Sequence, residues 1–110
     1  MHNAADIQKA AVEFQKHLVL PAVSNISYDE LVLYLAERIN VLLKDDFSAL
    51  VQLLYRMDIS EAKLRYLLQT NTGEMAATIM AKLMIERQLQ KIETRRSFKK
   101  DDNIPDEEKW

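Results

Sequence analysis

The chain has 110 residues, of which 48% are hydrophobic and 29% charged, the proportions of one compact soluble domain. It contains one glycine, two prolines and no cysteine, which excludes disulfide frameworks, thiolate-held metals, glycine-rich phosphate loops and turn-rich β sandwiches. The net charge of -2 argues against a surface that wraps nucleic acid as a whole, but it leaves room for a local basic patch.

The N-terminal part of the chain predicts a first helix and a cytoplasmic protein. Asn3 is a good helix cap, and apolar residues recur after it at helical spacing until Pro21 ends the pattern. No basic leader followed by an apolar run opens the sequence. No apolar stretch approaches the roughly 20 residues that a membrane-spanning helix needs, so we expect a cytoplasmic protein that does not enter the membrane.

Ser27 and Glu30 give the clearest helix start in the chain. Together they form a capping box, in which the serine hydroxyl and the glutamate side chain each accept a backbone N–H at the helix start. The helix is expected to run to about Lys44. Its predicted inward stripe consists of Tyr28, Leu31, Leu35, Ile39 and Leu42.

Two short helices are predicted next. One of the aspartates at 45–46 is expected to cap a helix over about residues 47–57. Asp58 and Glu61 then form a second pair of the capping-box type, with the aspartate as the cap. The helix that they open is expected to end near Gln69, before the turn-forming segment that contains the single glycine.

The last helix is predicted to be the longest, from about residue 74 to about residue 98, with Asn71 or Thr72 as its cap. Between residues 75 and 85 apolar side chains occupy nearly every direction around its axis. Such a helix is expected to be surrounded by partners. Because a small domain struggles to enclose it completely, we predict a homodimer through this helix.

These elements together predict an all-α fold, a compact bundle of about five helices with a long, largely buried C-terminal helix. Residues 1–98 are expected to form a single helical domain. Residues 99–110 hold five acidic side chains around Pro105 and are expected to form a flexible acidic tail.

A basic cluster near the end of the last helix is the candidate binding patch. Residues 86–100 hold six cationic and two anionic side chains. The cluster is suited to phosphates or to an acidic protein surface, and it is equally typical of a solvated helix end that complements the helix dipole. Its members are Arg87, Lys91, Arg95, Arg96, Lys99 and Lys100.

Other residues offer less for chemistry. Glu13 and His17 stand four residues apart, but a metal site on helices needs more ligands than this pair supplies. Arg38 and Arg56 flank apolar stripes and are candidates to bind a carboxylate, although such side chains more often only cover apolar surface. We therefore predict no catalytic residue, no cofactor and no metal.

Two segments carry a resemblance to a known class of proteins. Residues 56–64 read Arg-Met-Asp-Ile-Ser-Glu-Ala-Lys-Leu, and residues 85–92 read Ile-Glu-Arg-Gln-Leu-Gln-Lys-Ile. The stretch from Tyr28 to Arg96, above all in these two segments, resembles small bacterial cytosolic proteins of unassigned function. The resemblance implies a compact helical domain and transfers no catalytic residue to this chain.

The expected function is that of a noncatalytic protein-interaction or regulatory module that offers a helix face or groove to a protein partner not yet identified. The alternative is a nucleic-acid-associated factor that uses the basic cluster. An enzyme or a metal-binding protein is the least favoured of the three functional interpretations.

Overall fold

A computed structural model describes residues 3–18, 20 and 25–101, and of residues 96–101 it gives only the helix backbone. These ranges contain five α-helices and no strand, which confirms the predicted all-α class. The helices are α1 (Ala4–Gln15), α2 (Tyr28–Asp45), α3 (Phe47–Arg56), α4 (Glu61–Thr70) and α5 (Gly73–Asp101).

Four helices begin after residues that the sequence predicted as caps, and for α5 this residue is Thr72, whose Oγ1 accepts the Met75 N–H at 3.3 Å. Asn3 Oδ1 accepts a backbone N–H of the first turn of α1 at 2.7 Å. Ser27 and Glu30 form the full capping box of α2, with both hydrogen bonds at 3.1 Å. Asp46 Oδ1 accepts an N–H of the first turn of α3, also at 3.1 Å. Each cap satisfies an amide that would otherwise lack a partner.

The predicted cap of the fourth helix is wrong, because Ser60 rather than Asp58 caps α4. Asp58 has a φ of 60°, a left-handed conformation instead of the extended backbone of an N-cap. Its N–H donates to the Tyr55 carbonyl at 3.2 Å, and the Ile59 N–H donates to the Leu54 carbonyl at 2.9 Å. These two bonds form the Schellman motif that ends α3. Asp58 therefore closes one helix rather than opening the next.

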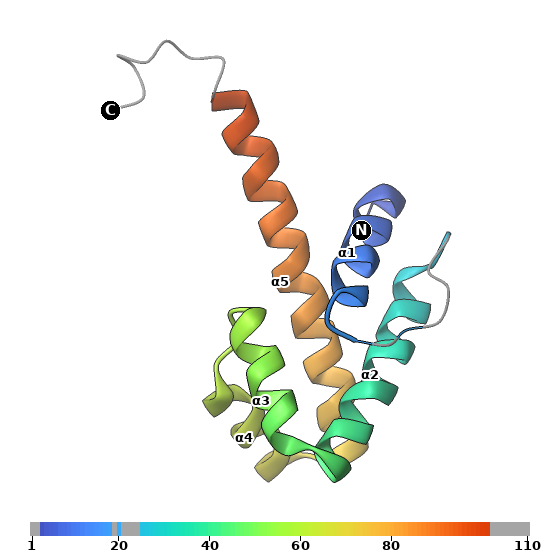
Figure 1. The fold of residues 1–110 in the computed structure, drawn as a ribbon, viewed down its shortest axis with the longest axis vertical. Helices are drawn as coiled ribbons and strands as arrows, with labels where there is room; N and C mark the ends of the chain where they lie inside the picture. The colour runs from blue at the N-terminus through green and yellow to red at the C-terminus, as the bar shows by residue number, and fades with distance from the viewer. Residues whose placement is uncertain (1–2, 19, 21–24, 102–110) are drawn as a thin grey trace.

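Helix α5 lies in the middle of the bundle, with α1 and α2 on one side and α3 and α4 on the other (Figure 1). It packs most extensively against α2 and also contacts α1 and α4. Its inward side combines small and flexible residues, which allow close approach of the neighbouring helices. The fully or almost fully buried side chains of its first half are Ala76, Ala77, Met80, Ala81, Met84 and Ile85.

The expectation that α5 is wrapped on every side is wrong in its first half. Met75 is 57% exposed, and Lys82 and Glu86, which follow it at helical spacing, are exposed as well. Ile79 and Leu83 are half-buried beside this strip. One side of the helix therefore meets water because α1, α2 and α4 do not close around it. The helix is still largely buried, and the homodimer through it stays a prediction.

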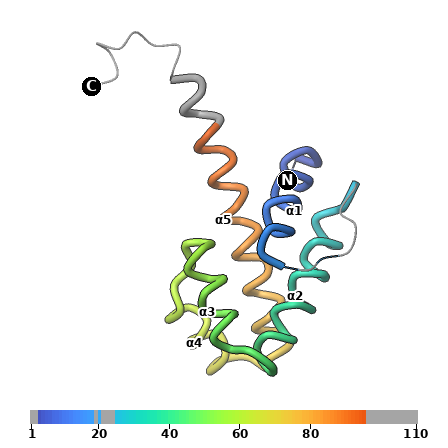
Figure 2. Tube along the Cα trace, in the orientation of Figure 1, coloured from blue at the N-terminus to red at the C-terminus, as the bar shows by residue number. Residues whose placement is uncertain are grey.

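The second half of α5 rises beyond the other helices (Figure 1), and the coloured part of its trace in Figure 2 runs upward past the top of α3. Ile92 is still buried, whereas Glu93, Thr94 and Arg95 are exposed. The backbone remains helical to Asp101, so residues 99–101, predicted as the start of the tail, belong to the helix. The rest of the predicted tail lies outside the described residues. Among the helices that the structure describes, none combines the length and the apolar character that crossing a membrane requires.

Leu35 and Leu33 of α2 provide a matched test of this packing. Leu35 is fully buried, whereas Leu33 is 54% exposed on the same helix. We expect Leu35→Ala to lower the free energy of unfolding by about 2–5 kcal/mol, because it opens a cavity in the core. Leu33→Ala is expected to change it by about 0.5 kcal/mol or less. Urea unfolding followed by circular dichroism measures both, and equal effects would contradict the described core.

Candidate functional site

The structure brings three of the six predicted patch residues to one face of α5. Arg87, Lys91 and Arg95 follow one another at intervals of four residues, which places their side chains in a row along the helix. The side chains of Arg96, Lys99 and Lys100 lie outside the described residues. We call the surface formed by Arg87, Lys91, Thr94 and Arg95 the basic face.

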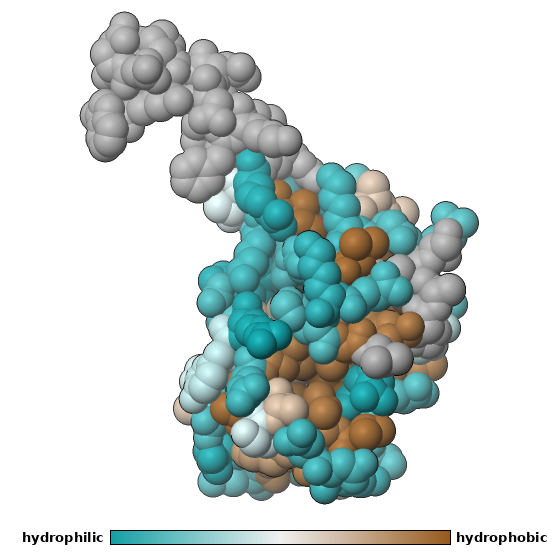
Figure 3. Space-filling model, viewed as in Figure 1, coloured by the Kyte–Doolittle hydropathy of each residue, from teal (hydrophilic) through white to brown (hydrophobic). Residues whose placement is uncertain are grey.

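The basic face lines a shallow hollow of about 360 Å³ on the second half of α5. Hydrophilic residues dominate the surface of this part of the molecule (Figure 3). Three cationic groups and one hydroxyl surround the hollow. All of them are hydrogen-bond donors, so the hollow is suited to an anionic group that accepts hydrogen bonds.

Asp58 places a carboxylate against the basic face from the connection between α3 and α4. Its Oδ2 lies 2.9 Å from Lys91 Nζ and 3.7 Å from Arg87 Nη2. The three side chains are partly exposed, and Asp58 itself is 54% exposed. The ion pairs therefore lie at the surface, where water and salt screen them. They connect the end of α3 to the second half of α5.

The same contacts lower the pKa of the Asp58 carboxyl below its ordinary value of 3.8. The hydrogen bond from Lys91 is the largest cause, followed by the attraction of the Lys91 charge and, more weakly, of Arg87. A carboxylate with a lowered pKa stabilises the folded state above its ordinary pKa. That contribution disappears as the pH falls through the lowered value.

Arg87, which lines the hollow, also contacts two neighbouring side chains. Its Nη1 donates to Gln90 Oε1 at 3.2 Å, and its Nη2 faces Asp58. Its Nε is buried and has no hydrogen-bond partner among the described residues. Arg95, by contrast, is exposed and forms no ion pair with any described side chain.

A second polar cluster joins α3 to α4 and is built differently. Glu61 accepts hydrogen bonds from Tyr55 Oη at 3.1 Å and from Arg65 Nε at 2.6 Å. These bonds lower the pKa of Glu61, mainly through Arg65, and the bond to Glu61 raises the pKa of Tyr55. The Arg65 guanidinium also lies 5.7 Å from the centroid of the Phe47 ring. All the charges in this cluster are matched, so it holds the two helices together and leaves no group over for a ligand.

The other candidate residues from the sequence do not come together as a site. His17 Nδ1 lies 3.3 Å from Arg56 Nη1, and Glu13 pairs with Lys16, so Glu13 and His17 each have a partner other than one another. Arg38 Nε is buried without a hydrogen-bond partner in the described part of the chain, and no carboxylate is recorded beside it. Nowhere in the described ranges do three or more carboxylate or histidine side chains converge as a metal ion would require.

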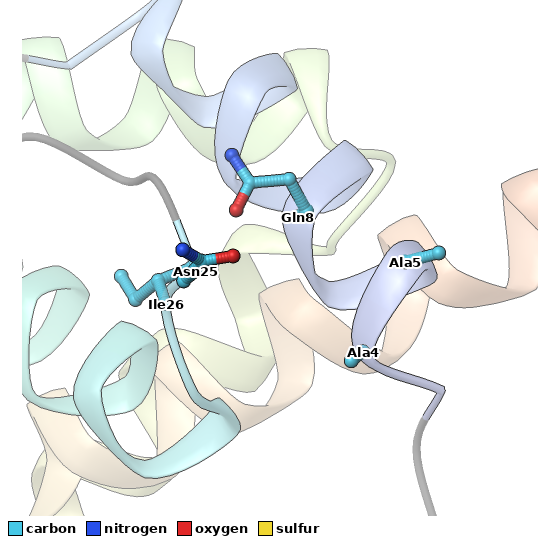
Figure 4. Close-up of a pocket in the computed structure, with 5 residues that line it drawn as sticks. All are labelled: Ala4, Ala5, Gln8, Asn25 and Ile26. Carbon is cyan, nitrogen blue, oxygen red and sulfur yellow. The ribbon is translucent and has the colours of Figure 1, made fainter.

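A larger hollow, of about 530 Å³, opens between the start of α1 and the segment that leads into α2. Figure 4 shows the Gln8 amide of α1 facing Asn25 and Ile26 across it. Gln8 Oε1 is buried and finds no hydrogen-bond partner among the residues described. The described lining carries no charge, and residues 21–24, which adjoin Asn25, lie outside the described residues.

Two residues of the site region escaped the sequence reasoning. Asp58 was interpreted as a cap, whereas it pairs with α5. Ser60, two residues later, is equally able to cap a helix, and its presence was the signal that α4 could begin there instead. Gln88 lies within the charged segment that the sequence offered as a patch or a solvated helix end, but it is only 4% exposed. Its position three or four residues from the buried Met84, Ile85 and Ile92 placed it on their side of the helix.

Lys91→Met tests the described ion pair. We expect it to raise the pKa of Asp58 towards 3.8, because it removes the hydrogen bond and the charge that lower this pKa most. Lys82→Met, which removes an exposed lysine from the first half of the same helix, is expected to leave the pKa of Asp58 unchanged. Carboxyl carbon chemical shifts followed against pH report both values, and a pKa that stays low in the Lys91 variant would contradict the pairing.

Comparison of the chain with protein-family models, with curated proteins and with solved structures finds no match in any of the three. No relative therefore supplies a function, and the interpretation of the basic face depends on the residues of this chain.

Proposed function

We propose that this protein is a noncatalytic interaction module that binds an acidic segment of a protein partner on the basic face of α5. The observation that carries the proposal is the carboxylate of Asp58, held 2.9 Å from Lys91 Nζ at a partly exposed position. The face thus has the geometry to bind a carboxylate in contact with water. A partner with several carboxylates in sequence would engage Lys91, Thr94 and Arg95 together.

Arg95 extends the surface beyond the contact that Asp58 already makes. It is exposed, lies one turn after Lys91, and has no ion pair with a described side chain. Arginine offers a planar fork of donors that matches a carboxylate. Because the second half of α5 rises past α3 and α4, a partner can approach this end of the face without displacing a neighbouring helix (Figure 1).

Nucleic-acid binding is less favoured by the same geometry. Affinity for nucleic acid grows with the number of phosphates neutralised, and two of the three cations described here already share the Asp58 carboxylate. A short peptide with a few separate carboxylates needs fewer cations than a polyanion does.

A titration followed by amide NMR tests the proposed function. A short peptide of alternating glutamate and serine is expected to shift resonances of residues 87–95, whereas the same peptide with glutamine in place of glutamate is not. Arg95→Gln is expected to weaken binding by about twofold to fivefold, the range for one charged contact at an exposed surface. Lys82→Gln removes the same charge from α5 outside the basic face and is expected to leave the affinity unchanged.

Three outcomes would overturn this function. The first is the absence of shifts with the acidic peptide. The second is an equal loss of affinity in the Arg95 and Lys82 variants, which would indicate attraction by overall charge alone. The third is tighter binding of single-stranded RNA, with an affinity that falls steeply as salt is added, which would indicate the nucleic-acid alternative.

The cytoplasmic location and the homodimer are also proposals. The absence of cysteine suits a reducing compartment. For the dimer, Met75 offers exposed apolar surface on the wet side of α5, next to the half-buried Ile79 and Leu83. Sedimentation equilibrium is expected to show self-association that Met75→Lys reduces. A strict monomer at all accessible concentrations would overturn the dimer.

A further inference from the structure

Asp58 occupies a backbone position that glycine or asparagine would fit better. Its φ of 60° is left-handed, and in a Schellman motif this position is usually glycine and sometimes asparagine. An aspartate there is less favourable for the backbone. The compensating contacts, with Lys91 and Arg87, are partly exposed and therefore contribute little to stability. The ion pairs alone explain poorly why a carboxylate stands at this turn.

The placement of the carboxylate suggests a role in binding. Asp58 Oδ2 lies on Lys91, at the same face that lines the hollow with Thr94 and Arg95. A carboxylate of the partner that reached Lys91 would have to share it with Asp58 or replace it. Because Asp58 is 54% exposed and sits on a connection rather than inside a helix, it can rotate into water when replaced.

We infer that Asp58 is an intramolecular stand-in for the partner's carboxylate, and that an acidic segment displaces it from Lys91 when it binds. This inference rests on the proposed function. It makes binding competitive with the contact between the α3–α4 connection and α5, so the two weaken each other by the same factor. Occupation of the basic face by a partner then releases the end of α3 from α5.

Asp58→Asn is the appropriate variant, because asparagine keeps the shape of the side chain and tolerates the left-handed backbone. We expect it to bind the glutamate–serine peptide about twofold to fivefold more tightly than the unaltered chain, since no carboxylate competes for Lys91. Asp58→Gly removes the carboxylate in a different way and is expected to act in the same direction. Asp45→Asn removes the same charge from the end of α2, outside the basic face, and is expected to leave the affinity unchanged.

A second readout separates displacement from a purely structural role. In the unaltered chain, saturation with the peptide is expected to raise the pKa of Asp58 towards its ordinary value, because its contact with Lys91 is lost. The carboxyl carbon shift of Asp58 reports this directly. A carboxylate that only fixed the turn would keep its lowered pKa when the peptide binds.

The outcomes distinguish the inference from the function on which it rests. Equal affinities of the Asp58→Asn variant and the unaltered chain, or weaker binding by the variant, would overturn the inference while the proposed function stands. Binding by the variant alone would support the inference and overturn the function for the unaltered chain. Absence of binding by both chains would overturn both. Loss of folding in both Asp58 variants would also overturn the inference, since a displaceable group cannot be essential to the fold.

Discussion

The packing of α5 against α2 is the constraint on which the rest of the molecule depends. These two helices make the most extensive contact in the bundle, and the buried residues of α5 are small or flexible where the neighbours come closest. Ala76, Ala77 and Ala81 allow close approach, and Met80 and Met84 fill the spaces between branched side chains. The short helices α3 and α4 lie on the other side of α5, and α4 contacts it there, while one side of α5 stays exposed to water (Figure 1). Helix α5 continues from this packed half as one helix to Asp101.

The net charge along the basic face depends on the residues that pack beside α5. On an isolated helix, Arg87, Lys91 and Arg95 would form a simple row of cations. In the folded chain the row is divided, because Asp58 contacts the first two and leaves the third without an ion pair among the described side chains. The local charge is thereby reduced near the bundle and retained towards the end of the helix. This gradient favours a partner of modest negative charge over a polyanion.

Asp58 shows why local signals left one part of the structure undecided. Asp58 and Ser60 are both good helix caps, and the residues around them fit either assignment. The choice depends on the Schellman motif at the end of α3 and on Lys91, which is 33 residues away in the chain. Gln88 is a different case, because its spacing from the buried Met84, Ile85 and Ile92 already placed it on their side of the helix. At Asp58, a distant part of the chain decides between two sound local signals.

The amino-acid sequence by itself determined the helices, most of their caps and the inward stripes, because capping and helical periodicity act within a few residues of one another. The tertiary structure alone decided which side of α5 is wet and which cation meets a carboxylate. Those outcomes depend on the way separate helices approach each other in space, and no spacing along the chain encodes that approach. The six basic residues could be read from the sequence as a patch, but the pairing that divides their charge follows from packing.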